Sequence, residues 1–162
     1  MYKKILVPLD GSQRAEAILP HVESLALRLH AEVVLLYVDE MSAMMLERDE
    51  VVDAATFLDE RRRRIKKHQD YLQEIAERWR SIDIAAQVRI ARGGVVACII
   101  DTARREAIDL VAMASHGESG AERTFYGSVA ASVLNRIDRP LLLVRSRRIR
   151  PPSVDNGRRI AY

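Results

Sequence analysis

Glycine, serine and aspartate follow two aliphatic runs of this sequence in an arrangement that could hold a phosphate. Asp10-Gly11-Ser12 comes directly after the run Ile5 to Leu9, and Gly117 and Gly127-Ser128 lie in the stretch that follows Leu110 to Met113. Glycine lets backbone amides approach a ligand closely, and the unpaired N–H groups of a helix N-terminus attract anions. On spacing alone, phosphate binding competes with a plainer interpretation in which these residues only turn the chain and start helices.

The sequence lacks the motifs that other common phosphate, metal and catalytic sites require. No G-x-x-x-x-G-K-[ST], no G-x-G-x-x-G after a strand and no H-E-x-x-H occurs, and the four histidines are far apart in the sequence. His116-Gly117-Glu118-Ser119-Gly120 is similar to a hydrolase elbow but lacks the G-x-S-x-G spacing. The single cysteine, Cys98, falls within a helical pattern without an evident base, which is typical of a packed thiol. Serine hydrolysis and thiol catalysis are therefore not expected.

Alternating strands and helices must position the glycines and Asp10. Short aliphatic runs predict five strands, at residues 5–9, 33–38, 84–90, 110–113 and 141–144. Apolar residues at three- and four-residue intervals predict four helices between them, over 15–29, 54–80, 96–107 and 127–137, with Ser12 or Asp10 capping the first. The alternation predicts an open doubly wound α/β fold, a five-stranded parallel sheet with helices on both faces.

Ligands of such sheets bind beyond the carboxyl ends of the strands, which here are Asp10-Gly11-Ser12, Val38-Asp39-Glu40 and Ala114 to Gly117. Residues 39–53 have no clean period and predict a Met-rich, acidic loop. Arg61 to Arg64 are adjacent in the long second helix and fan around its axis, so a solvated face is favoured over a nucleic-acid contact.

Length and charge indicate one folded domain with a basic tail. A chain of 162 residues that is 48% hydrophobic can bury a sizeable core, and a lone cysteine fits a reducing compartment. The net charge of +3 comes from residues 145–162, with six arginines and one aspartate; residues 1–144 carry 20 Lys and Arg against 22 Asp and Glu. Nucleic acid is therefore an unlikely partner. No apolar run is long enough to span a membrane, and no secretory signal is expected.

Four segments together resemble the universal stress protein family, and the resemblance covers nearly all of residues 2–146. They are Lys4 to Ser12, Leu35 to Val38, Ala114 to Val129 and Arg139 to Val144. ATP-binding members of that family have the pattern G-x2-G-x9-G-[ST] between the fourth strand and the fourth helix. This chain has Gly117 and Gly127-Ser128 at the family spacing and departs from the pattern only at Ala114, where a methyl group would lie near the ribose or phosphates.

The resemblance implies a Rossmann-like domain over residues 1–146 that binds ATP with Mg²⁺ or Mn²⁺. Prolines and scattered arginines predict that residues 147–162 form a basic, flexible tail. Asp10 would lie near the ribose and metal-bound phosphates, Val38 would contact adenine, and the remaining site residues would line the pocket or surround the phosphates: Pro8, Leu9, Ala114, Gly117, Gly127, Ser128 and Val129. His116 and Arg123 could also approach phosphate.

The family also implies a cytoplasmic homodimer, paired through Leu141 to Val144, that acts in stress response or signalling and not as an enzyme beyond slow ATP hydrolysis. The alternative left open is a nucleotide-free dimeric interaction module, favoured by Ala114 and by the Met-rich segment 41–45. An adenylating enzyme is disfavoured because S-G-G-x-D-S is missing after the first strand.

Overall fold

The computed structural model describes residues 1–40, 54–115 and 127–145, and these form a parallel five-stranded sheet with helices on both faces. The strands are β1 (Lys4–Pro8), β2 (Glu32–Asp39), β3 (Ala86–Arg92), β4 (Leu110–Ala114) and β5 (Leu141–Val144). The helices are η1 (Ala15–Ile18), α1 (Leu19–Leu29), α2 (Ala54–Arg80), α3 (Val95–Arg105) and α4 (Ser128–Arg136). Their order in the chain confirms the predicted doubly wound α/β fold.

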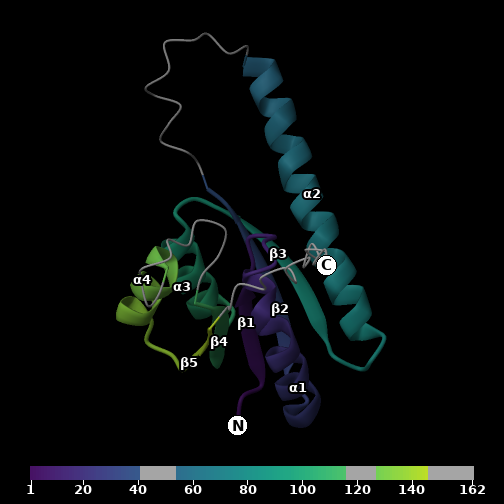
Figure 1. Ribbon diagram of the computed structural model, residues 1–162, viewed down its shortest axis with the longest axis vertical. Helices are drawn as coiled ribbons and strands as arrows, with labels where there is room; N and C mark the ends of the chain where they lie inside the picture. The colour runs from purple at the N-terminus through teal and green to yellow at the C-terminus, as the bar shows by residue number, and fades with distance from the viewer. Residues whose placement is uncertain (41–53, 116–126, 146–162) are drawn as a thin grey trace, which may run out of the picture.

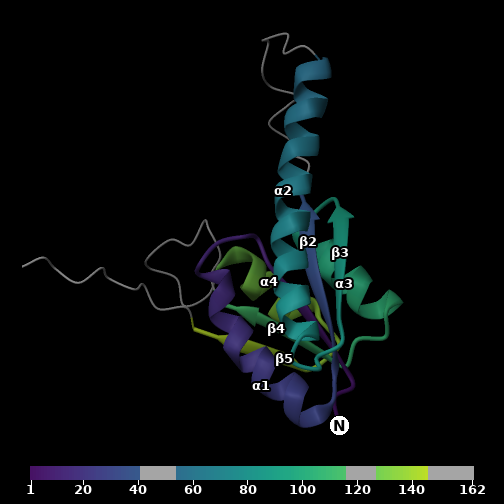
Figure 2. The same ribbon diagram turned by 90° about the vertical axis from the view of Figure 1, so that its right-hand side faces the viewer.

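The sheet separates two apolar layers because its strand residues alternate between two helical faces. Ile5, Val33 and Leu35 pack under α1 and α2, with helix residues such as Val22 and Leu72. Leu6, Val34 and Val111 pack on the opposite face against α3 and α4. Figures 1 and 2 show α1 and α2 on one side of the sheet and α3 and α4 on the other. Continuously aliphatic strands are required here because both faces are covered.

The strand order β3-β2-β1-β4-β5 reverses its direction between β1 and β4. β1 pairs with β2 along its whole length, from Lys4–Glu32 to Pro8–Leu36. It pairs with β4 only through Ile5–Leu110 and Leu6–Val111, so the carboxyl ends of β1 and β4 are not hydrogen-bonded to each other. This is the topological switch point, at which doubly wound sheets bind ligands.

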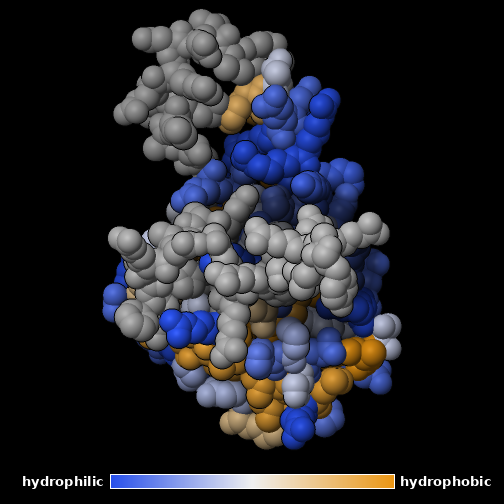
Figure 3. Space-filling model, in the orientation of Figure 1, coloured by the Kyte–Doolittle hydropathy of each residue, from blue (hydrophilic) through white to orange (hydrophobic). Residues whose placement is uncertain are grey.

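The 27-residue helix α2 has two different halves. Its C-terminal half is anchored by Leu72, Ile75, Ala76 and Trp79, and the Trp79 indole Nε1–H donates to Glu23 Oε2 over 2.8 Å. Its N-terminal half extends beyond the carboxyl ends of the strands, where Figures 1 and 3 show a projecting and largely hydrophilic segment. Apolar packing therefore fixes one end of α2, and other contacts must hold the end near the switch point.

The chain departs from the predicted elements in two places. The first helix begins as the 3-10 segment η1 and becomes α-helical only at Leu19, because Pro20 has no N–H and its ring would clash with the carbonyl of Glu16 in a continuous α-helix. β3 begins at Ala86 and not at Ile84, whose N–H instead donates to the Trp79 carbonyl over 3.0 Å in the turn after α2. The Ile84 side chain still packs in the core.

The loop predicted over residues 39–53 starts too early, because Asp39 is the last residue of β2. Residues 41–53 of that loop and the predicted tail over 147–162 lie outside the described residues. None of the described helices is long and apolar enough to cross a membrane.

Candidate functional site

Asp10 organises the turn between β1 and η1. Its Oδ1 accepts a hydrogen bond from the Ser12 N–H over 2.9 Å, and the Ser12 hydroxyl oxygen accepts one from the Ala15 N–H over 3.1 Å. Gly11 has φ +83°, a left-handed conformation that favours glycine. Ser12 therefore caps the first turn of η1, as predicted, whereas Asp10 fixes the turn that precedes it.

The chain returns to the end of β4 at the start of α4. The Gly127 N–H donates to the Ser115 carbonyl over 2.8 Å, and the Ser115 N–H donates to the Val144 carbonyl over 2.8 Å. Gly127, the N-cap of α4, has an extended backbone and makes no side-chain capping hydrogen bond. The first turn of α4 carries no acidic residue. The first amides of α4 have no partner inside the helix. They lie beside the end of β4 and form a suitable place for an anion.

The remaining predicted site residues divide between the two faces of the sheet. Val38 and Val129 pack at the edge of the cluster under α3 and α4, and the alternation of β1 places Pro8 on that face. Leu9 is only 4% exposed and packs under α1 and α2, so its backbone is the part available at the edge. Gly117, His116 and Arg123 lie outside the described residues.

Ala114 points away from α4. It pairs with Val144, and both Val144 and Ala112 belong to the cluster under α1 and α2. Alternation along β4 therefore directs the Ala114 methyl group toward that face, where it is buried, and not toward the N-terminus of α4. The alanine that departs from the family pattern thus places its methyl group on the side away from the first amides of α4.

A buried ion cluster that the sequence interpretation missed lies at the end of β2. Asp39 is 1% exposed, and its carboxylate accepts hydrogen bonds from Arg61 Nε over 2.7 Å and Arg64 Nη2 over 2.8 Å. Burial alone would raise the pKa of the Asp39 carboxyl, but the bonds from Arg64 and Arg61 outweigh burial and lower this pKa. The interpretation of all four arginines as a solvated face is therefore wrong for Arg61, whereas Arg64 pairs with Asp39 and still leaves half of its side chain exposed.

A second missed contact joins α2 to the Asp10 turn. The His68 ring stacks on the Tyr37 ring, with centroids 4.0 Å apart and an interplanar angle of 15°. A Cβ on Gly11 would lie 2.9 Å from His68 Cε1 and 3.0 Å from Nδ1, so the imidazole fills the space beside this glycine. A signal existed in the sequence: positions 61, 64 and 68 continue the spacing of the buried residues Leu72, Ile75 and Trp79 toward the helix N-terminus.

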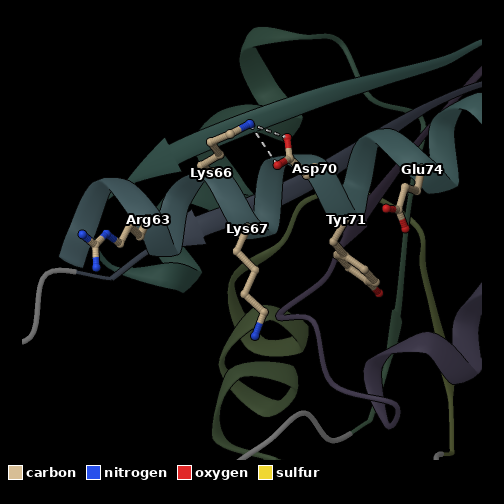
Figure 4. A pocket seen from close by; sticks show the side chains of 6 residues that line it. All are labelled: Arg63, Lys66, Lys67, Asp70, Tyr71 and Glu74. Carbon is tan, nitrogen blue, oxygen red and sulfur yellow. Dashed lines mark hydrogen bonds and ion pairs between the residues drawn. The ribbon is translucent and has the colours of Figure 1, made fainter. Parts of the chain in front are cut away.

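An open groove of about 540 Å³ runs along α2, apart from the predicted site residues. Its lining is Arg63, Lys66, Lys67, Asp70, Tyr71 and Glu74 (Figure 4). Lys66 Nζ and Asp70 Oδ2 form an exposed ion pair of 3.0 Å. Lys67 and Tyr71 leave the helix on the same side in Figure 4, and the Tyr71 hydroxyl donates to Glu16 Oε1 of η1 over 2.9 Å. The groove has the character of a solvated helix face.

The described residues contain no group of three or more His, Cys, Asp or Glu side chains placed to hold a metal ion. The polar groups that the topology brings to this edge of the sheet are instead the Asp10 carboxylate after β1, the Ser128 hydroxyl and the first amides of α4. A carboxylate and a set of N–H donors on one edge suit a ligand that carries both hydroxyl and phosphate groups.

The fold and this edge define an open doubly wound α/β protein in which Gly127, at the start of the fourth helix, is hydrogen-bonded to Ser115 at the end of the fourth strand. The chain belongs to the Universal stress protein family, whose sequence pattern matches residues 1–145. It is 28% identical to universal stress protein MJ0531 of Methanocaldococcus jannaschii, over 90% of this chain and 83% of that protein. It is also 28% identical to universal stress protein YxiE of Bacillus subtilis, over 90% of this chain and all of that protein.

Solved structures share the fold. The structure of MJ0577 from M. jannaschii superposes with a TM-score of 0.79 at 27% identity, over 91% of this chain and 99% of that one. A family protein from Arabidopsis thaliana with AMP bound gives a TM-score of 0.65 at 16% identity, over 94% and 97% of the two chains. A universal stress protein in complex with cAMP gives 0.63 at 18% identity, over 90% and 98%.

Proposed function

We propose that this universal stress protein binds an adenine nucleotide, with ATP preferred, at the carboxyl edge between β1 and β4. The observation that carries the proposal is the Gly127–Ser115 hydrogen bond, which brings the N-terminus of α4 back to the end of β4 at the switch point. The family relationship supports the same ligand class, since solved relatives hold AMP and cAMP.

In this proposal the base lies beside Val38, and the ribose and phosphates lie between Asp10 and Gly127-Ser128-Val129, with Gly117 completing the loop. Pro8, Leu9 and Ala114 form the floor, with Leu9 contributing backbone. A bound Mg²⁺ or Mn²⁺ would neutralise phosphate charge. Because the described residues offer no metal cluster of their own, Asp10 would hold such an ion together with the phosphates.

Occupancy, and not turnover, is the proposed output of the site, in stress response or signalling in the cytoplasm. A hydrolytic mechanism needs a base that can accept a proton near neutral pH. Asp39, the carboxylate beside Val38, is committed to Arg61 and Arg64, and its pKa is lowered. It is therefore a poor general base, which supports a binding role.

Isothermal titration with ATP and MgCl₂ tests the proposal. The unaltered chain should release or absorb heat on binding, and Asp10→Ala should weaken ATP by at least about tenfold, since hydrogen bonds to charged groups contribute roughly 1.5–3 kcal/mol. Asp59→Ala is the matched control, because Asp59 is an exposed residue of α2 whose carboxylate pairs only weakly with Arg62, at 3.6 Å. No heat at millimolar ATP would refute nucleotide binding, and equal affinity for AMP and ATP would refute the preference for ATP.

A second function, dimeric assembly through β5, has its own support. β5 is an edge strand that pairs only with β4 in the described sheet, and all four of its aliphatic residues are partly exposed. An unpaired aliphatic edge is an aggregation risk that a partner strand would remove. Light scattering should therefore give about twice 18.4 kDa, and a monomer at micromolar concentration would contradict the dimer. If the dimer forms but no nucleotide binds or copurifies, the interaction module is the better description.

A further inference from the structure

The inner face of α2 changes character near the carboxyl end of β2. Its C-terminal half packs on the sheet through buried apolar residues such as Leu72 and Trp79. Its N-terminal half meets the same face of the sheet through Arg61, Arg64 and His68. These three side chains occupy helix positions at which apolar residues would pack on the sheet. Hydrophobic burial therefore does not explain why polar residues stand there.

One of these three residues, His68, reaches the turn that carries Asp10. His68 lies against Gly11, the residue next to Asp10, and stacks on Tyr37, which is only 8% exposed. Burial raises the pKa of the Tyr37 hydroxyl, Arg64 lowers it, and the Asp39 and Asp10 carboxylates raise it further, so Asp10 lies within electrostatic reach of this ring.

The imidazole restricts the conformations open to the turn. Gly11 has φ +83°, and a backbone with no Cβ can leave that conformation easily unless neighbouring atoms prevent it. The His68 ring occupies the space beside Gly11, while Tyr37 on its other side is held in β2, a strand that is paired on both edges, with β1 and with β3. Asp10 Oδ1 then keeps its hydrogen bond to the Ser12 N–H.

We propose that His68 is a positioning residue for the nucleotide site: its ring, stacked on Tyr37, holds the Asp10–Gly11 turn in the conformation that presents the Asp10 carboxylate. This role rests on the proposed function, because it supposes that Asp10 faces a nucleotide. None of the predicted ligand contacts lies in α2. In this proposal α2 affects nucleotide affinity indirectly, through the His68 side chain.

A double-mutant cycle with Asp10 tests the proposal, since it separates action through Asp10 from general loosening of the fold. His68→Ala should weaken ATP about five- to tenfold, as expected for a misplaced charged contact, and less than about twofold in the Asp10→Asn background. His68→Phe keeps a flat ring for stacking on Tyr37 and should retain affinity within about twofold. Gln69→Ala, at the adjacent exposed position of α2, is the control and should change nothing.

Equal losses from His68→Ala in both backgrounds, or no loss from His68→Ala in the chain that keeps Asp10, would overturn the role while leaving nucleotide binding intact. No heat from the unaltered chain would overturn the proposed function and this role with it.

Hydrogen exchange in the nucleotide-free chain gives an independent measurement. The Ser12 amide, bonded to Asp10 Oδ1, should exchange about tenfold faster in His68→Ala because the turn opens more often, while the Val22 amide of α1 should not change. An unchanged Ser12 rate would show that His68 does not hold the turn, whatever the titrations give.

Discussion

Replacing Asp39 by asparagine should weaken the charged hydrogen bonds that hold the N-terminal half of α2 on the sheet. The carboxylate is 1% exposed and bonded to Arg61 and Arg64, whose side chains are 14% and 50% exposed. In Asp39→Asn the amide oxygen can still accept from one guanidinium, but the amide N–H₂ group faces the other donor and leaves it unpaired. Breaking a fully buried ion pair costs about 3–5 kcal/mol, and the exposure of Arg64 reduces this to roughly 2–3 kcal/mol.

The assay is urea unfolding at pH 7, followed by the fluorescence of Trp79. This residue is the only tryptophan of the chain, is fully buried and lies at the opposite end of α2 from the ion cluster. For a chain of this length 1 kcal/mol corresponds to about 2–4 °C, so thermal unfolding should shift down by roughly 4–12 °C. Asp70→Asn is the matched control, because it removes the exposed Lys66–Asp70 pair of the same helix and should cost less than about 0.5 kcal/mol.

Two results would refute the reasoning about Asp39. The first is a loss in Asp39→Asn no larger than the loss in Asp70→Asn. The second concerns a variant that also carries Arg61→Met and Arg64→Met, in which no unpaired charge remains. This triple variant should recover part of the stability, since replacing a whole buried ion cluster is often neutral. If it is less stable than Asp39→Asn alone, the cost does not come from stranded arginines.

Three further outcomes follow from single sites. Gly11→Ala should lower the thermal midpoint, at a cost of about 2 kcal/mol from positive φ and contact with His68, whereas Gly94→Ala, with no atom within 4 Å of its Cβ, should be nearly neutral. Burial raises the pKa of Glu106, but hydrogen bonds from Arg89 and Lys4 outweigh burial and lower this pKa. The ionised carboxylate therefore stabilises the fold above the ordinary pKa of about 4.3, and this contribution is lost as the pH falls through the lowered pKa. Glu106→Gln should therefore cost about 1 kcal/mol in urea unfolding at pH 7 and close to nothing near pH 3. Burial and Asp101 raise the pKa of Cys98, so iodoacetamide at pH 8 should alkylate the folded chain several times more slowly than the chain in urea, and equal rates would contradict this.

The sequence predicted the elements well where one local pattern determines them. The long periodic stretch of α2 ends at Arg80 as expected, and every strand was predicted within two residues because the aliphatic runs are continuous. Ile84 was assigned to the third strand because it is aliphatic, but its contact with the core comes from a turn. The strand order has no local signal, since it depends on which long-range pairings form.

The candidate site was predictable to the extent that the carboxyl-end rule applies. Val38, Asp10 and Gly127 were selected because each lies at the end of a strand or the start of a helix, and the structure brings their segments to one edge. His68 and Arg64 were not found: their positions continue the spacing of the buried residues of α2, but charged side chains are usually solvated and the partners of these two lie far away in the chain. Only the fold reveals that α2 crosses above the turn that contains Gly11.

The hydrogen bond from Gly127 to Ser115 also bears on how this family can vary in sequence. It joins the two ends of the segment 116–126 at a point fixed by β4 and by the bond from Ser115 to Val144. The frame of the domain therefore does not depend on what lies between these ends. Since doubling the length of a flexible loop costs only about 0.6 kcal/mol, insertions and deletions between Ser115 and Gly127 should be tolerated while the N-terminus of α4 stays in place.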